Sequence, residues 1–195
     1  KPFAQNVQVS EKMYLTFDFE ATSAGGHSSV PGRENAIYDL ARALERLSGH
    51  DFPAALNFVT RLNFTRLASV ETGPLATAME ALSRNEATPE QVKTVSAVPR
   101  YNAILRTTCV ATRLDAGHGD NALPQRAKAT VNCRLLPKED PEFIRSELQK
   151  LAGDKVRVTP RAQARTSEPS DAQSPVIKTI TRVTESLWPG TPVIP

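Results

Sequence analysis

Apolar and polar residues alternate along the chain from position 13 to position 20. One face of this stretch carries Met13, Leu15, Phe17 and Phe19, and the other carries Tyr14, Thr16, Asp18 and Glu20. A period of two is typical of a half-buried β-strand. Residues 105–114 are rich in β-branched side chains, residues 126–136 alternate again, and residues 155–159 form a short strand-like segment. The pattern therefore predicts four strands.

Apolar residues recur at helical spacing in two longer segments, 35–48 and 140–151. The expected apolar face of the first segment consists of Ala36, Ile37, Leu40, Ala41, Leu44 and Leu47. The second segment begins with Asp140 as N-cap and Pro141 at the first helical position, and Gly153 ends it. Both segments are predicted to be helices that bury one face.

Without residues 55–104, the predicted order of elements is β-α-β-β-α-β. This order is that of the ferredoxin-like α+β fold, a four-stranded antiparallel sheet with two helices on one face. Residues 55–104, in which Leu75–Leu82 is the clearest of several short helices, are then a helical insertion in a domain spanning 7–160. Residues 161–173 are polar and rich in Pro and Ser, which is typical of a linker. The amphipathic helix within 174–195 is expected to belong to a further domain.

Composition narrows the class of protein. Apolar residues make up 39% of the 195 and charged residues 23%, which favours a packed core and argues against wholesale disorder. The 24 basic residues exceed the 21 acidic ones by 3, and this small excess is spread along the chain, so no nucleic-acid partner is predicted. The strands 107–114 and 126–136 contain no Phe, Tyr or Trp, which also argues against an RNA-binding sheet. No run approaches about 18 apolar residues, so no membrane span is expected.

The two ends of the sequence lead us to expect a piece of a longer protein. The chain starts at Lys1 without an initiator Met or a signal peptide, and it stops at Pro195 directly after an apolar run. Any targeting segment would lie upstream, so the sequence assigns no cellular compartment.

The first motif that could carry chemistry is the loop GGHSSVP at residues 25–31. His27 stands between flexible glycines and two hydroxyl side chains, just after a predicted strand. Such a histidine can present its ring outside the domain and donate a hydrogen bond to a developing oxyanion. The alternative is a turn whose histidine is only solvated, and composition by itself favours that alternative.

The second motif is the turn GHGDNALP at residues 117–124. His118 and Asp120 have the H-x-D spacing of a metal site. His27 and His50, the two other histidines, have no ligand-rich neighbourhood, and no Glu-Glu pair occurs in the chain. No metal ligand is therefore predicted in this chain.

The third motif is Asn132-Cys133-Arg134 on the strand after that turn. Alternation places Asn132 and Arg134 on one face of the sheet. A guanidinium fixed on a strand can bind a carboxylate bidentately, and the alternative is a half-buried arginine with a local acidic partner. A hairpin centred on Asn121 would set Cys109 opposite Cys133. This register permits a cross-strand disulfide, but we expect two reduced, buried cysteines.

Three motifs in order, G-G-H-S-S-x-P, G-x-x-x-N-x-x-P and x-N-x-R-x-x-P, carry a resemblance that covers about residues 7–160. The chain resembles the dimerisation, or lid, domain of the zinc-dependent aminoacylase/carboxypeptidase family. That family includes acetylornithine deacetylase, succinyl-diaminopimelate desuccinylase and the glutamate carboxypeptidases. The helical insertion is most similar to the carboxypeptidase S and N-acyl-amino-acid hydrolase branch.

The resemblance implies a role for three residues. His27 matches the lid histidine that polarises the scissile carbonyl, in dimeric members at the partner subunit's active site. Asn121 matches the asparagine that contacts the substrate near that carbonyl. Arg134 matches the arginine that binds the free carboxylate of the substrate.

The resemblance also implies an enzyme of which this chain is one part. The two zinc ions of the family lie in a catalytic domain that this chain lacks, so the fragment alone is expected to be inactive. We expect hydrolysis of peptide or N-acyl-amino-acid amide bonds, with the protein's own catalytic domain and a second identical subunit as partners. The alternative is a purely structural dimerisation module in which His27 is incidental.

Overall fold

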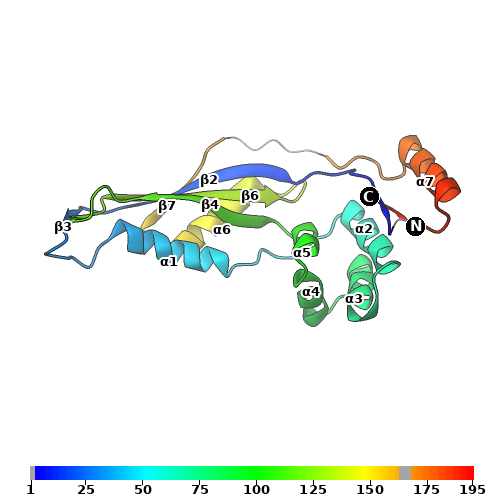
Figure 1. The fold of residues 1–195 in the computed structure, drawn as a ribbon, viewed down its shortest axis with the longest axis horizontal. Coiled ribbons are helices and arrows are strands. Elements are labelled where there is room, and N and C mark those ends of the chain that lie inside the picture. Colours follow the sequence, from blue (N-terminus) through cyan, green and yellow to red (C-terminus); the bar gives the residue numbers. More distant parts are fainter. Residues whose placement is uncertain (1–2, 163–167) are drawn as a thin grey trace. The chain divides into compact units, whose positions relative to one another are not determined.

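The computed structural model describes residues 3–162 and 168–195, which form two units (Figure 1). The sheet unit lies within Lys12–Phe52 and Thr107–Thr166, and the helical unit lies within Lys1–Glu11, Pro53–Arg106 and Ser167–Pro195. The expected helical insertion thus belongs to the same unit as the two end segments of the chain, and each unit is assembled from segments far apart in sequence.

Four antiparallel strands form the sheet of the sheet unit. They are β2 (Met13–Thr22), β4 (Thr108–Ala116), β6 (Arg126–Leu135) and β7 (Val156–Pro160). Their order across the sheet is β4-β6-β2-β7, and every neighbouring pair is antiparallel. This order, with one helix after β2 and one after β6, is the ferredoxin-like arrangement, so the predicted fold class is confirmed.

Two helices, α1 (Ala36–Ser48) and α6 (Pro141–Ala152), cover one face of this sheet (Figure 1). The side chain of Asn35 caps α1 by accepting a hydrogen bond from Ile37 N–H at 2.9 Å, and Asp140 caps α6 through Glu142 N–H at 2.9 Å. Gly153, at a φ of 75°, ends α6 as predicted. The buried face of α1 differs from the prediction, because Ala43 is buried whereas the expected Ile37 and Ala41 are exposed.

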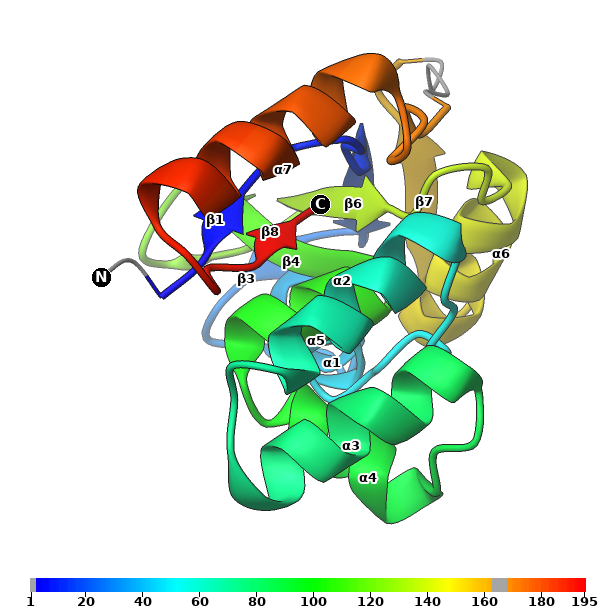
Figure 2. The ribbon, with the colours of Figure 1, turned by 90° about the vertical axis from the view of Figure 1, so that its right-hand side faces the viewer.

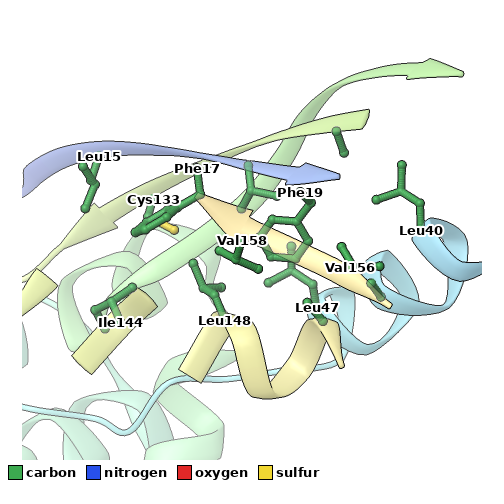
Figure 3. Close-up of a cluster of buried hydrophobic side chains, with 14 of the residues drawn as sticks. Leu15, Phe17, Phe19, Leu40, Leu47, Cys133, Ile144, Leu148, Val156 and Val158 are labelled. Atoms are coloured by element: carbon green, nitrogen blue, oxygen red, sulfur yellow. The ribbon is translucent and has the colours of Figure 1, made fainter. Parts of the chain in front are cut away.

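The core of the sheet unit fills the space between the sheet and these two helices (Figure 3). Its labelled members are Leu15, Phe17, Phe19, Leu40, Leu47, Cys133, Ile144, Leu148, Val156 and Val158. Phe17 and Phe19 have no exposed surface, as expected for the apolar face of an alternating strand. The opposite face of the sheet carries the polar residues of the same strands.

A disulfide joins Cys109 on β4 to Cys133 on β6. The expected hairpin register is confirmed, since these residues are direct partners across the two strands, with their Cα atoms 4.1 Å apart. The expectation of two reduced cysteines is wrong. Directly opposed residues on antiparallel strands point to the same face, which brings their side chains together.

The helical unit is built mainly from short helices (Figure 2). They are α2 (Phe58–Ala68), α3 (Gly73–Arg84), α4 (Pro89–Ser96), α5 (Pro99–Leu105) and α7 (Pro175–Leu187). The short strands β1 (Gln5–Asn6) and β8 (Val193–Ile194) pair in parallel beside them. Ile194 of β8 packs in one cluster with Phe64 and Met79, so the end of the chain completes the core of this unit.

The expected linker is described only in part, since residues 163–167 lie outside the described residues. Within residues 168–173, Ser170 N–H donates to Val9 O at 2.7 Å, and Ala172 is buried with Val9 and Val59. This part of the segment therefore packs on the helical unit. Among the described residues, no helix combines the length and the apolar character needed to cross a membrane.

Candidate functional site

His27 is carried by a continuation of the two central strands. Beyond the last paired residues of β2 and β6, Ser23 N–H donates to Gln125 O at 3.0 Å. The strands β3 (Gly26–His27) and β5 (Ala122–Leu123) then pair, with His27 opposite Ala122. Ser28 N–H donates to Asn121 O at 2.9 Å and closes this extension. The extension, which we call the arm, lies at one end of the sheet, where β3 is labelled in Figure 1, and it carries His27 on one of its two chain segments and Asn121 on the other.

Two glycines allow the arm to form. Gly25 and Gly26 have φ values of 76° and 144°, which side chains with a Cβ rarely adopt. A Cβ on Gly25 would lie 2.5 Å from Cγ of Gln125, and one on Gly26 would lie 3.3 Å from Cδ1 of Leu123. The backbone before His27 therefore requires glycine for both its conformation and its close approach to the returning strand.

The imidazole of His27 is exposed and held by its own loop. Ser29 Oγ lies 2.8 Å from Nδ1, and Ser29 N–H donates a hydrogen bond to the same nitrogen at 3.2 Å. Within the described part of the chain, Nε2 has no hydrogen-bond partner. The ring can therefore offer Nε2 to a group outside the sheet unit.

Asn121 lies in a tight turn before β5, in which Ala122 N–H donates to Gly119 O at 3.3 Å and Gly117 has a φ of 79°. Its backbone oxygen is used by Ser28, but its side-chain amide is exposed and forms no hydrogen bond with any described residue. An amide can donate and accept. Asn121 and His27 together thus present unpaired polar atoms at the same end of the sheet.

Arg134 lies at the other end of β6. The strand runs eight residues from Arg126 to Arg134, which at about 3.3 Å per residue is roughly 26 Å. Its guanidinium lies over the ring of Tyr14, 4.8 Å from the centroid, and no described carboxylate pairs with it. The structure places His27 and Asn121 in the same arm, where Asn121 is opposite Ser28, so that the side chains of His27 and Asn121 leave opposite faces of the two chain segments. It keeps Arg134 apart from both.

Tyr14 and Lys12 beside Arg134 are absent from the sequence-based site. Tyr14 and Thr108 are the direct strand partners of Arg134, and Lys12 Nζ donates to Thr108 Oγ1 at 3.2 Å. The pKa of the Lys12 ammonium is lowered to about 8, mainly by burial. The negative charge of Glu139 raises this pKa, and the positive charge of Arg134 lowers it further. From sequence, the alternation of β2 and β6 can predict that Tyr14 and Arg134 lie on the same face of the sheet. Only the strand register shows that they are directly opposite each other.

A network of charges occupies the middle of the polar sheet face. Arg161 Nε donates to Asp18 Oδ1 at 2.8 Å, Lys128 Nζ lies 2.8 Å from Asp18 Oδ2, and Arg161 Nη2 donates to Thr130 Oγ1 at 2.7 Å. Burial raises the pKa of Asp18, but the hydrogen bonds and charges of Arg161 and Lys128 outweigh it, so its pKa lies below the ordinary value. These residues satisfy one another and stabilise the sheet face.

The described residues do not fit a metal ion. They contain no group of three or more His, Cys, Asp or Glu side chains placed to hold one. His118 and Asp120, which have the H-x-D spacing, lie exposed in the turn before β5.

Comparisons with known proteins identify the family of this chain. The model of the peptidase dimerisation domain matches residues 9–160. Probable carboxypeptidase S-like 2 of Dictyostelium discoideum is 32% identical over 154 residues, which are 79% of this chain and 29% of that protein. The mouse N-fatty-acyl-amino acid synthase/hydrolase PM20D1 is 26% identical over 210 residues, covering 100% of this chain and 39% of that protein. The chain thus spans well under half the length of these relatives.

Among solved structures, the M20 family metallo-carboxypeptidase Sso-CP2 from Sulfolobus solfataricus has the same fold, with a TM-score of 0.58 and 19% identity, over 98% of this chain and 53% of that one. Aminopeptidase PepT from Bacillus cereus superposes with a TM-score of 0.52 and 10% identity, over 97% of this chain and 39% of that one. The sheet order, the matched domain model and these relatives lead to one assignment. The chain belongs to the M20 peptidase family, as its dimerisation domain.

Proposed function

We propose that this chain is the lid of a two-zinc amidohydrolase that cleaves the amide bond of peptides or N-acyl amino acids. The observation that carries the proposal is the arm, where Nε2 of His27 is exposed and has no hydrogen-bond partner among the described residues, and the same is true of the side-chain amide of Asn121. An N-acyl amino acid as substrate is supported by the name of the mouse relative, an N-fatty-acyl-amino acid synthase/hydrolase. The zinc ions would be bound by the catalytic domain of the full-length protein, because the described residues offer no site for them.

The role proposed for His27 follows from the charge that develops during hydrolysis of an amide. When a nucleophile attacks the carbonyl carbon, negative charge accumulates on the carbonyl oxygen. A hydrogen-bond donor already positioned at that oxygen stabilises the transition state more than the ground state. His27 would donate from Nε2, and the Asn121 side chain would contact the substrate near the same carbonyl.

Arg134 is proposed to bind the free carboxylate of the substrate. A guanidinium stacked on Tyr14 and without a described acidic partner can form a bidentate pair with a carboxylate. In an N-acyl amino acid only the amide nitrogen and Cα separate the scissile carbonyl from the free carboxylate. Because Arg134 and the arm of one chain are at least roughly 26 Å apart along the strand, they cannot contact these two groups of the same molecule. The proposal therefore has Arg134 serving its own subunit's active site and the arm serving that of a partner subunit.

The proposed partners, a second copy and the chain's own catalytic domain, are supported by exposed surfaces in each unit. In the sheet unit, β4 is an edge strand, and Val110 and Leu114 on it are 60% and 66% exposed. In the helical unit, α7 turns apolar side chains outward, including Val176 and Leu187 at 66% and 62% exposure. The edge strand fits pairing with a second copy, and the helix fits packing against the catalytic domain.

The alternative function is a module that only assembles subunits. The exposed edge of β4 supports this function as well as it supports the lid, because both require a second copy. The two functions differ in what they require of His27. If the domain only pairs subunits, removing the imidazole leaves the activity of the full-length protein intact.

The test is the substitution His27→Ala in the full-length protein loaded with zinc, assayed for release of free amino acid from a panel of N-acyl amino acids and dipeptides. Loss of one oxyanion donor is expected to lower kcat by about 10²–10³-fold. His118→Ala, which removes another exposed imidazole from the same end of the sheet, is the matched control and should keep full activity. Unchanged hydrolysis by a folded His27→Ala protein would establish the assembly module instead. This chain alone is expected to hydrolyse none of these substrates.

A further inference from the structure

The contacts of His27 determine which of its ring nitrogens carries the proton. The backbone N–H of Ser29 lies 3.2 Å from Nδ1, and an N–H group can only donate. Nδ1 must therefore hold a lone pair, and the single proton of the neutral imidazole resides on Nε2. The hydroxyl of Ser29, 2.8 Å from the same nitrogen, must then also act as a donor.

We infer that Ser29 is a positioning residue that holds His27 in the Nε2–H tautomer and in one ring orientation. The inference rests on the proposed function and deepens it, because only this tautomer directs an N–H from the neutral ring to an external oxyanion. A 180° turn of the ring about χ2 would replace Nδ1 by a carbon and lose both contacts with Ser29. The proton stays on Nε2 throughout, since the role is to donate a hydrogen bond and not to transfer a proton.

The neighbouring serine provides a contrast within the same loop. Ser28 uses its backbone N–H to bind Asn121 O at 2.9 Å, and its hydroxyl forms no hydrogen bond with the ring of His27. Both serines are exposed. Ser28 therefore joins the two strands of the arm, whereas Ser29 acts on the imidazole. Removing the hydroxyl of Ser28 is a matched control for removing that of Ser29.

The first measurement needs no variant of Ser29. The full-length protein is labelled with ¹⁵N-histidine, and the signal of His27 is identified by its loss in His27→Ala. The ¹⁵N shifts of the two ring nitrogens then report which one carries the proton at neutral pH. The expected result is a protonated Nε2 and an unprotonated Nδ1. A ring protonated on Nδ1 overturns the inference.

The second measurement compares Ser29→Ala, Ser29→Thr and Ser28→Ala in the zinc-loaded full-length protein. Ser29→Ala keeps the longer backbone contact at 3.2 Å and loses the shorter hydroxyl contact at 2.8 Å. The restraint on the ring is then weaker, so we expect part of the population to leave the Nε2–H tautomer or turn about χ2, and kcat to fall by about fivefold at unchanged KM. Ser29→Thr, which restores a hydroxyl, and Ser28→Ala should both keep the wild-type spectrum and kcat. If Ser29→Ala leaves both the spectrum and kcat unchanged, the inference is wrong.

These measurements separate the inference from the proposed function. A protonated Nε2 in a protein whose activity survives His27→Ala would refute the oxyanion role alone. A protein inactivated by His27→Ala but protonated on Nδ1 would refute the role of Ser29 alone.

Discussion

Asp18 forms ion pairs with two basic residues on the polar face of the sheet. It lies on the central strand β2, and both of its carboxylate oxygens are occupied by cations, Arg161 on one and Lys128 on the other. These contacts hold its pKa below the ordinary value of 3.8 in spite of burial. A carboxyl group whose pKa is lower in the folded state stabilises that state above its unfolded pKa. The contribution disappears as the pH falls through the folded pKa.

The substitution Asp18→Asn should therefore lower the free energy of unfolding at pH 7 by about 1 kcal/mol, the upper part of the range for partly exposed ion pairs. The difference from wild type should shrink as the pH is lowered below about 4, because the carboxyl is protonated first in the unfolded state and, at still lower pH, in the folded state. Urea unfolding at pH 7 and pH 3 measures both values. Asp154→Asn, on an exposed turn, is the control and should change neither. A loss that is equal at both pH values would show that the charge of Asp18 contributes nothing.

Local signals made some residues predictable and left others hidden. Asp140 and Gly153 contact only residues a few positions away in the chain, so their roles in starting and ending α6 can be predicted from the sequence. The order of three motifs predicts roles for His27, Asn121 and Arg134. The stacking of Arg134 on Tyr14 joins residues 134 − 14 = 120 positions apart. The pKa of Lys12 is lowered by its burial and is also affected by Glu139 and Arg134, both more than 120 positions away. Only the folded register supplies such partners.

At the level of elements, the edge strand β4 is secured by the disulfide between Cys109 and Cys133. Every residue of β4 from Val110 to Ala116 is exposed, so the strand has few apolar contacts to hold it. The crosslink spans 24 positions of the chain and attaches the start of β4 to the central strand β6. It thus compensates for the weak burial of the element that borders the sheet.

Reduction of this disulfide should destabilise the chain by about 3.5 kcal/mol, the loop-entropy value for a closed loop of this size. The comparison uses one sequence, oxidised or treated with dithiothreitol, so no cavity is introduced. Thermal unfolding followed by circular dichroism measures the effect, and a thiol count verifies the redox state. The double variant Cys109→Ala/Cys133→Ala must be insensitive to the reductant. An equal Tm for the oxidised and reduced wild type would exclude a stabilising crosslink.

The type and order of the elements were predictable because each depends on a local period. Alternation identified β2 and β6, and helical spacing with caps identified α1 and α6. Two results could not be predicted in this way. The arrangement of α2 to α5 in one unit with β8 depends on a cluster of buried side chains from distant parts of the chain, which includes Phe64 and Ile194. The oxidation state of the cysteines depends on how closely two strands approach, and spacing alone leaves it open.

For the whole molecule, the main consequence is that the arm and Arg134 lie at opposite ends of one sheet. In a symmetric pair of subunits, each active site would combine the Arg134 of one subunit with the His27 and Asn121 of the other. Neither subunit could then form a complete site alone. The sharing of active sites can therefore be tested by mixing variants, without knowledge of which surfaces join the two subunits.

Full-length subunits carrying His27→Ala, mixed with subunits carrying Arg134→Ala, should regain activity. If the subunits exchange at random, half of the dimers are mixed and one of their two sites is intact, so about a quarter of the wild-type activity is expected. The matched control mixes His27→Ala with Asn121→Ala. Both of these changes affect the arm, so no intact site can form. Absence of recovery in the first mixture, with mixed dimers verified by two affinity tags, would show that the arm does not serve a partner.

The central position of β2 has a consequence for synthesis on the ribosome. β2 pairs with β6 on one side and with β7 on the other, and even its nearest partner residues, Thr22 and Arg126, are 126 − 22 = 104 positions apart. At about 5–20 residues per second, β2 waits roughly 5–20 s before β6 is made. During that time Phe17 and Phe19 have no sheet to enter. The nascent chain should therefore depend on chaperones that shield apolar strands until the second half of the sheet emerges.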